Sequence, residues 1–349
     1  MIASREFAPD GRAGERAAPR RVAGWSCRTA LCVLAVVMCA CAKSDPDRVP
    51  RANLVTGSTG GGWYLIGSAI AERTNQSFPG RPLTAMPGAG GVSNPARIAK
   101  LPGDLGISYV PFLRAAYRGD PPYPERYAEL RHVATLIDSK FHLLIADTLE
   151  MTSLGDIRSR RLPVRIATGP PGSAEEFMVR ESLKSYGISY DDIRNWGGRI
   201  DLLGTSERAD AWRDHHVNLV GFMLNEPAAI VMELIAARPA RIWSVPATVS
   251  RDLEEKWGVR SMTIPGRSYP NHPEPTVTLG MATVLFTTSH LGDDVVYALT
   301  KMIAESQPYL VQVHAAFNQW RPAEMAAHGD VPVHSGSARY YRERGWTTP

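Results

Sequence analysis

The chain has 349 residues, of which 44% are hydrophobic and 21% charged, values typical of a globular protein large enough for two domains. The net charge is +4, but outside residues 1–41 the chain has 33 basic and 32 acidic residues, and this balance argues against nucleic acid as a partner. All 4 cysteines lie within residues 1–41, which excludes a disulfide framework and a cysteine metal site from the rest of the chain.

Residues 1–41 have the pattern of a secretory leader. A basic stretch (20–28) precedes an apolar run (29–40), which is shorter than the roughly 20 residues that span a bilayer. Two interpretations remain: Cys41 is the lipidated residue of a lipoprotein and 42–51 is its tether, or a peptidase cuts nearby and releases a soluble periplasmic protein. The lipoprotein is favoured, because it explains why a cysteine-free body follows directly after a cysteine. Both interpretations predict export to the periplasm.

The body begins with alternating strands and helices. The pattern predicts strands at 52–56, 83–88 and 104–110, and helices at 64–76 and 93–101. This β-α-β-α-β order favours a mostly parallel sheet covered by helices.

The alternation starts again after residue 130. We predict strands at 132–137, 141–147, 217–224 and 240–245, a strand–turn–helix at 164–188, a helix at 226–237, and a long helical stretch at 292–317 that is interrupted at Pro308. The expected fold is α/β with two lobes of the periplasmic-binding-protein type and a ligand cleft between them. Lobe I would comprise 52–140 and 251–349, and lobe II 141–250.

The stretch "TGSTGGGWYLIG" (56–67) joins a predicted strand to a predicted helix. Glycines at such a junction let backbone N–H groups approach a ligand, and the helix N-terminus favours an anionic group. The stretch lacks the lysine of a phosphate loop and the glycine order of a dinucleotide fingerprint, and G-x-S-x-G occurs nowhere in the chain. Trp63 and Tyr64 suit a pocket wall, although a glycine-rich turn with aromatic core anchors is the competing structural interpretation.

Three further loops follow predicted strands in the same way: "PGAGGVSNP" (87–95), "ATGPPGSAEEFM" (167–178) and "GFMLNEPAAI" (221–230). In the second of these, Ser173 and Glu176 form a capping box, which is a structural explanation in itself. Four such loops, at strand carboxyl ends and split between two lobes, predict a cleft that binds a small ligand.

Six segments carry a family resemblance: "TGSTGGGWYLIGSAIAE", "GAGGVSNPARIAK", "GDLGISYV", "ATGPPGSAEEFMVRESLKSYGISYDDI", "VVYALTKMI" and "VHSGSARYYRERGW". Together, over about residues 52–346, they resemble the TAXI family, the extracytoplasmic solute receptors of tripartite ATP-independent periplasmic (TRAP) transporters. The resemblance implies two α/β lobes that close on a small, usually anionic solute. It implies no catalysis and no cofactor, and it implies membrane transport subunits as partners.

The resemblance also implies ligand-binding residues, which lie in the four loops and in "DLGISYV": Ser58, Thr59, Gly61, Gly62, Trp63, Tyr64, Ser93, Asn94, Tyr109, Gly169, Pro171, Gly172, Ser173 and Phe222, with Asn225 supported more weakly. Glu175 stands where the family usually has threonine. A carboxylate there repels a bare carboxylate ligand and attracts an ammonium group. Either the solute carries an amine as well as a carboxylate, or Glu175 points away from it.

The resulting expectation is a monomeric periplasmic receptor that captures a small organic anion or an amino acid for a TRAP-type transporter, without a metal. Two alternatives stay open. The same binding fold could serve a signalling partner as a ligand sensor. A periplasmic hydrolase would need a nucleophile with its base or a metal cluster, and the sequence shows neither.

Overall fold

The computed structural model describes residues 51–346 except 79 and 81, so the leader and Cys41 lie outside the described residues. The strands are β1 (Ala52–Val55), β2 (Leu83–Met86), β3 (Leu105–Tyr109), β4 (Leu130–Ala146), β5 (Arg165–Thr168), β6 (Arg199–Leu202), β7 (Leu219–Leu224), β8 (Ala240–Ile242), β9 (Arg260–Ile264) and β10 (Thr276–Thr288).

The α-helices are α2 (Gly62–Ser77), α3 (Ser93–Ala99), α4 (Val110–Arg118), α5 (Gly155–Ser159), α6 (Ala174–Lys184), α7 (Tyr190–Asn195), α8 (Thr205–Arg213), α9 (Ala229–Ala237), α10 (Ala247–Trp257), α11 (Asp293–Glu305), α12 (Gln307–Val313) and α13 (Ser335–Glu343). Two short 3₁₀ helices, η1 (Ala315–Asn318) and η2 (Pro322–Ala326), lie between α12 and α13. None of the helices described is long and apolar enough to cross a membrane.

The described strands form one sheet in the order β2-β1-β3-β10-β4-β7-β5-β6, with β8 beside β4 and β9 beside β10. The pairs at the two ends, β1 with β2 and β3, and β5 with β6 and β7, are parallel. The expectation of a mostly parallel sheet is wrong for the centre. There β10 runs antiparallel to β3, β4 and β9, and β4 runs antiparallel to β7 and β8.

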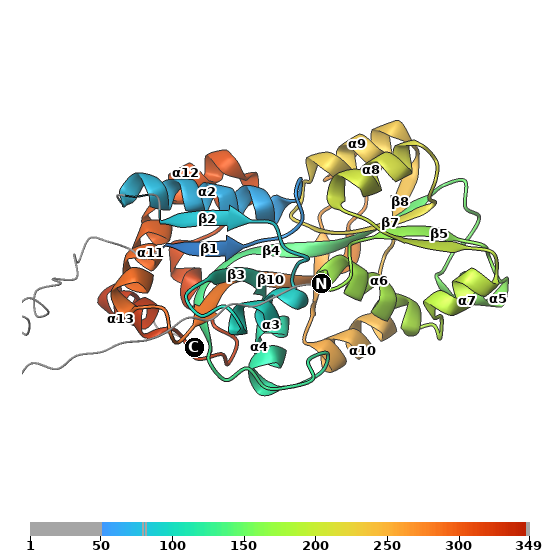
Figure 1. The fold of residues 1–349 in the computed structure, drawn as a ribbon. Coiled ribbons are helices and arrows are strands. Elements are labelled where there is room, and N and C mark those ends of the chain that lie inside the picture. The colour runs from blue at the N-terminus through green and yellow to red at the C-terminus, as the bar shows by residue number, and fades with distance from the viewer. Residues whose placement is uncertain (1–50, 79, 81, 347–349) are drawn as a thin grey trace, which may run out of the picture. The chain divides into compact units, whose positions relative to one another are not determined.

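The strand β4 is continuous for 17 residues, where the sequence predicted two shorter strands. The polar residues Asp138, Ser139 and Lys140 interrupt its apolar pattern, yet their backbone pairs with β10. The first part of β4 pairs with β10, and its last part pairs with β7, so this strand joins the β1–β3 end of the sheet to the β5–β7 end. Figure 1 shows β4 and β10 running between these two ends.

The ladder between β4 and β10 is irregular at two places, one between Leu285 and Phe286 and one between Ala282 and Val284. Ala282 pairs with Asp138 and Val284 pairs with Thr135, so β4 has one residue more than β10 between these two pairs. Thr283, the β10 residue at this irregularity, pairs with Tyr109 of β3 on its other side. An extra residue of this kind disrupts the ladder locally and increases the twist of the strand.

The helices cover the sheet with their apolar faces. In α2 the buried positions include Ile66, Ile70 and Thr74, spaced by four residues as expected for one helix face. This face shares a hydrophobic cluster with Leu54 of β1 and Leu285 of β10. Helices α11 and α12, from the end of the chain, pack against α2, so the C-terminal part of the chain returns to the β1–β3 end.

A buried chain of hydrogen bonds links the last part of β4 to the start of α9. The Tyr269 hydroxyl accepts a bond from the Ala228 amide (3.1 Å) and lies 2.9 Å from Nε2 of His142. The Tyr269 hydroxyl therefore donates its proton to Nε2 of His142. The imidazole proton is then on Nδ1, which donates to the Lys140 carbonyl oxygen at 2.9 Å. Burial lowers the pKa of His142 from 6.5 to about 4, so the ring is neutral at pH 7.

This histidine should make stability depend on pH. Between pH 6.5 and about 4 the unfolded chain binds a proton at residue 142 and the folded chain does not, so stability falls as the pH is lowered. The loss due to His142 between pH 7.5 and pH 5 is expected to be about 2 kcal/mol. Urea unfolding of the wild type and of His142→Gln at both pH values measures it. The variant should lose less stability on acidification, and equal losses in the two proteins would contradict the assignment.

Candidate functional site

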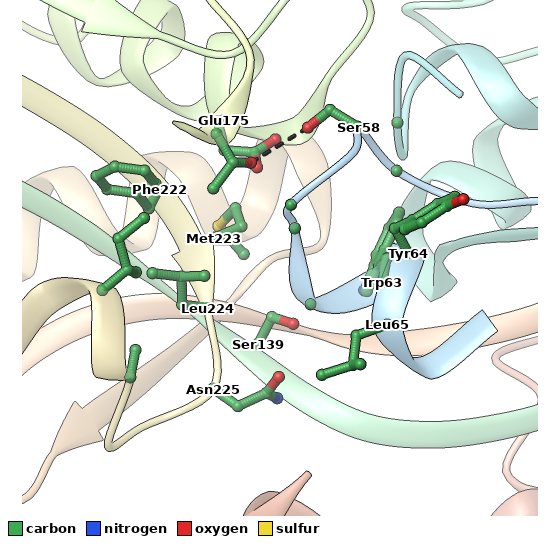
Figure 2. A pocket seen from close by; sticks show the side chains of 18 of the residues that line it. Ser58, Trp63, Tyr64, Leu65, Ser139, Glu175, Phe222, Met223, Leu224 and Asn225 are labelled. Atoms are coloured by element: carbon green, nitrogen blue, oxygen red, sulfur yellow. Dashed lines mark hydrogen bonds between the residues drawn. The ribbon is translucent and has the colours of Figure 1, made fainter. Parts of the chain in front are cut away.

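A cavity of about 650 Å³ lies between loops from the two ends of the sheet. From the β1–β3 end and the sheet centre, its lining comprises residues 57–65 apart from Thr59, together with Ser68, 89–91, Tyr109 and Ser139. From the β5–β7 end, it comprises Pro170, 173–175, Thr205, Arg208, 222–225 and 227–230, and residues 313–315 complete it. This volume is in the range of pockets that bind small organic molecules. Figure 2 shows side chains from both ends around the same space.

Loops from the two ends touch each other beside the cavity at two places. The Ser58 and Thr205 hydroxyl oxygens are 3.2 Å apart (Figure 2, dashed line from Ser58). At the second place, the carbonyl oxygen of Gly172 accepts hydrogen bonds from the amides of Val92 (3.1 Å) and Ser93 (3.0 Å). We call these the two loop contacts. They join segments from both ends of the sheet beside the cavity.

Helices α2 and α9 begin at the cavity without a side-chain cap. Helix α2 starts after Gly61 and α9 after Ala228, and neither residue offers a capping side chain. Both helix starts line the cavity. The amides of the first turn of a helix have no partner within it, and the helix dipole adds partial positive charge there. These positions suit an acceptor oxygen or an anionic group of a ligand.

Aromatic rings form one wall. The rings of Trp63 and Tyr109 lie 4.5 Å apart between centroids at an angle of 48°. The indole Nε1 of Trp63 donates to Thr283 Oγ1 (3.3 Å), which fixes the ring against β10. Tyr109 is buried, and burial, with the nearby Glu175 carboxylate second, raises the pKa of its hydroxyl, so that it stays protonated as a hydrogen-bond donor.

The charged groups of the lining are Glu175 and Arg208. The Arg208 side chain is only 1% exposed, and its Nη2 lies 3.5 Å from Glu175 Oε1. Its Nη1 donates to the Gly221 carbonyl oxygen (2.7 Å), Nη2 donates to Thr205 Oγ1 (3.2 Å), and the guanidinium carbon lies 4.5 Å from the centre of the Phe222 ring. Burial lowers the pKa of Arg208, against the raising effect of Glu175.

The model of the NMT1-like family matches residues 54–345 of this chain. The chain belongs to the NMT1-like family. Solved structures resemble it in fold. One is described as the structure of a periplasmic transporter (TM-score 0.50, 14% identity, 84% of this chain and 92% of that one). Another is the periplasmic binding protein BugD (TM-score 0.51, 12% identity, 86% and 99%). The predicted α/β fold of the periplasmic-binding-protein type is thereby confirmed.

In this NMT1-like protein, many of the residues predicted for the site lie together. The predicted residues that line the cavity are Ser58, Gly61, Gly62, Trp63, Tyr64, Tyr109, Ser173, Glu175, Phe222 and the more weakly supported Asn225. They come from three of the four predicted loops and, for Tyr109, from "DLGISYV". The fourth loop, "PGAGGVSNP", contributes Ala89, Gly90 and Gly91 instead. Glu175 is among the residues that line the cavity.

Six predicted residues are not part of the lining: Thr59, Ser93, Asn94, Gly169, Pro171 and Gly172. Thr59 and Pro171 are exposed. Asn94 is fully buried, and its Nδ2 donates to the carbonyl oxygens of Thr56 and Ile107, both at 2.8 Å, so it holds neighbouring loops in place. Ser93 and Gly172 belong to one of the two loop contacts. Gly169 packs closely on Ser173.

Sequence reasoning missed several lining residues: Ser139, Thr205, Arg208, Met223, Leu224, residues 227–230 and residues 313–315. Ser139 lay between two predicted strands, and no helix was predicted at 205–213. His314 lay within a predicted helical stretch, whereas α12 ends at Val313 and His314 caps η1 through its side chain. Burial lowers the pKa of His314, which favours its neutral form at pH 7.

Proposed function

We propose that this NMT1-like protein is a periplasmic solute-binding receptor, in which the cavity captures a small organic molecule. The observation that carries the proposal is the cavity itself. Glycine-rich loops at the carboxyl ends of strands line it from both ends of the sheet, and the two loop contacts join segments from both ends beside it. Ligands of open α/β sheets bind at strand carboxyl ends, where helix N-termini and loops meet. The fold shared with periplasmic binding proteins supports the same function.

The finer assignment is a TAXI-type receptor that delivers its solute to the membrane subunits of a TRAP transporter. The six motifs described above support it. On this proposal the leader exports the chain to the periplasm, Cys41 carries a lipid anchor, and the protein acts as a monomer whose lobes meet near residues 140 and 250. The expected solute is a small organic anion or an amino acid, and the uncapped starts of α2 and α9 would receive its acceptor oxygens.

A thermal-unfolding screen with small carboxylates and amino acids tests the function. A solute at 100 times its Kd should stabilise the folded protein by about 2.7 kcal/mol, a clear rise in Tm. The protein is unfolded and refolded before the screen, to remove any solute retained through purification.

A cavity-filling substitution then locates the binding site. Leu224 lines the cavity, whereas Leu202, also the last residue of its strand, is exposed and is not part of the lining. Leu224→Trp should abolish stabilisation by the solute, and Leu202→Trp should retain it. Stabilisation that survives Leu224→Trp, or no stabilisation by any compound of the screen, would contradict the proposal.

A further inference from the structure

The carboxylate of Glu175 is the charge that the cavity presents to a ligand. Glu175 lies in the first turn of α6, lines the cavity, and keeps 21% of its side chain exposed. In the described part of the chain its ion-pair partner is Arg208, at 3.5 Å. That distance is at the outer limit of a hydrogen bond, and charge-assisted bonds between nitrogen and oxygen are normally 2.7–2.9 Å. The carboxylate is therefore only partly compensated.

Arg208 is poorly placed to bind a ligand anion. Its side chain is 1% exposed, its two shorter hydrogen bonds go to the neutral oxygens of Gly221 and Thr205, and one face of the guanidinium lies against Phe222. A ligand carboxylate would have to displace these contacts. Among the described lining residues there is no other arginine and no lysine, and burial lowers the pKa of His314.

The start of α6 is also occupied. Ser173 Oγ accepts a hydrogen bond from the amide of Glu176 (3.1 Å), so this helix end is capped by its own side chain, unlike α2 and α9. The acidic side chain of Glu175 in the same turn further offsets the positive end of the helix dipole. The part of the cavity at the start of α6 therefore attracts a cation, whereas the starts of α2 and α9 attract acceptor oxygens.

We propose that the solute carries a protonated nitrogen that binds Glu175. The proposal rests on the receptor function above and narrows its solute class. The apolar side chains of Leu65, Met223 and Leu224 line the cavity beside the polar Ser139 and Asn225 (Figure 2), so the nitrogen belongs to a solute with apolar as well as polar surface. An ammonium group supplies the donors that the Glu175 carboxylate lacks.

The test uses three six-carbon probes that differ in the head group: hexylamine, hexanol and sodium hexanoate. Their Kd values are measured by calorimetry at pH 7 with the refolded wild type, Glu175→Gln and Glu176→Gln. Glu176 is the matched control, because it lies in the same helical turn, pairs with Arg180 (2.9 Å), and is not part of the lining. Wild type should bind hexylamine at least about tenfold more tightly than hexanoate. Glu175→Gln should weaken hexylamine binding about tenfold, and Glu176→Gln should leave it unchanged.

Three results would overturn the inference: hexanoate binding as tightly as hexylamine, an unchanged Kd for hexylamine in Glu175→Gln, or no binding of hexylamine at 10 mM. If Glu175→Gln does not fold, the comparison of probes on the wild type decides alone. The screen described under the proposed function separates the two proposals. A solute that stabilises the protein while hexylamine fails leaves the receptor function intact, whereas the absence of any binder removes both.

Discussion

Replacing Arg208 by methionine is expected to lower the free energy of unfolding by about 3 kcal/mol. The substitution keeps much of the buried volume but removes the donors to the Gly221 carbonyl oxygen and to Thr205. A buried carbonyl without a donor and a half-buried Glu175 carboxylate without its cation both cost free energy in the folded state. Urea unfolding at pH 7 measures the loss.

Arg213→Met is the matched control for this prediction. Arg213 lies at the end of the same helix, its side chain is 37% exposed, and it pairs with Asp210 and Glu233 at the surface. Exposed ion pairs contribute little, so its replacement should change stability by no more than about 1 kcal/mol. Similar losses in the two variants would show that Arg208 contributes no more than a surface arginine.

The second large effect is expected at Gly172, where alanine should weaken solute binding about tenfold. A Cβ atom there would lie 2.8 Å from Cβ of Ser93, closer than folded proteins allow. The loops would have to separate, and the hydrogen bonds from Val92 and Ser93 to the Gly172 carbonyl oxygen would weaken. Loss of this loop contact opens the cavity on one side and raises the Kd of the solute, measured by calorimetry.

Gly197→Ala separates this effect from backbone strain. Gly172 and Gly197 share a φ of +83°, a conformation that costs alanine about 1 kcal/mol or more. A Cβ on Gly197 would meet only Pro163 Cβ, at an ordinary 3.8 Å. Both variants should therefore lose stability, but only Gly172→Ala should lose affinity. An unchanged Kd in Gly172→Ala would mean that the loop contact does not contribute to binding.

The parts of the fold that could be predicted from the sequence are those set by local pattern. The order strand, glycine-rich loop, helix from residue 52 onward correctly predicts β1 and α2. Apolar periodicity and turn residues can be recognised within a few neighbouring positions. The antiparallel centre could not be predicted in this way. No strand was predicted over 276–288, and its pairing with both β3 and β4 joins segments more than 100 residues apart in the sequence.

In the site too, residues in local motifs could be predicted, whereas residues placed by contacts between distant segments could not. The glycine motif and its aromatic residues could be predicted, because clustered glycines between a strand and a helix are typical of a loop at a helix start. Arg208 was not, because it lies in "TSERADAWR", a polar segment that is typical of a surface helix. Only the packing of α8 buries this arginine beside Glu175, which precedes it by 33 residues.

The continuity of β4 and β10 has a mechanical consequence. These strands are shared by both ends of the sheet, so the loops on either side of the cavity cannot move apart without torsion of the strands themselves. One irregularity of the β4–β10 ladder lies at Thr283, where the extra residue of β4 increases the local twist. Trp63 is hydrogen-bonded to that residue, so an aromatic ring of the cavity wall is attached to the sheet at an irregular point of the ladder. Opening of the cavity would then twist these continuous strands, rather than rotate two rigid lobes about a flexible linker.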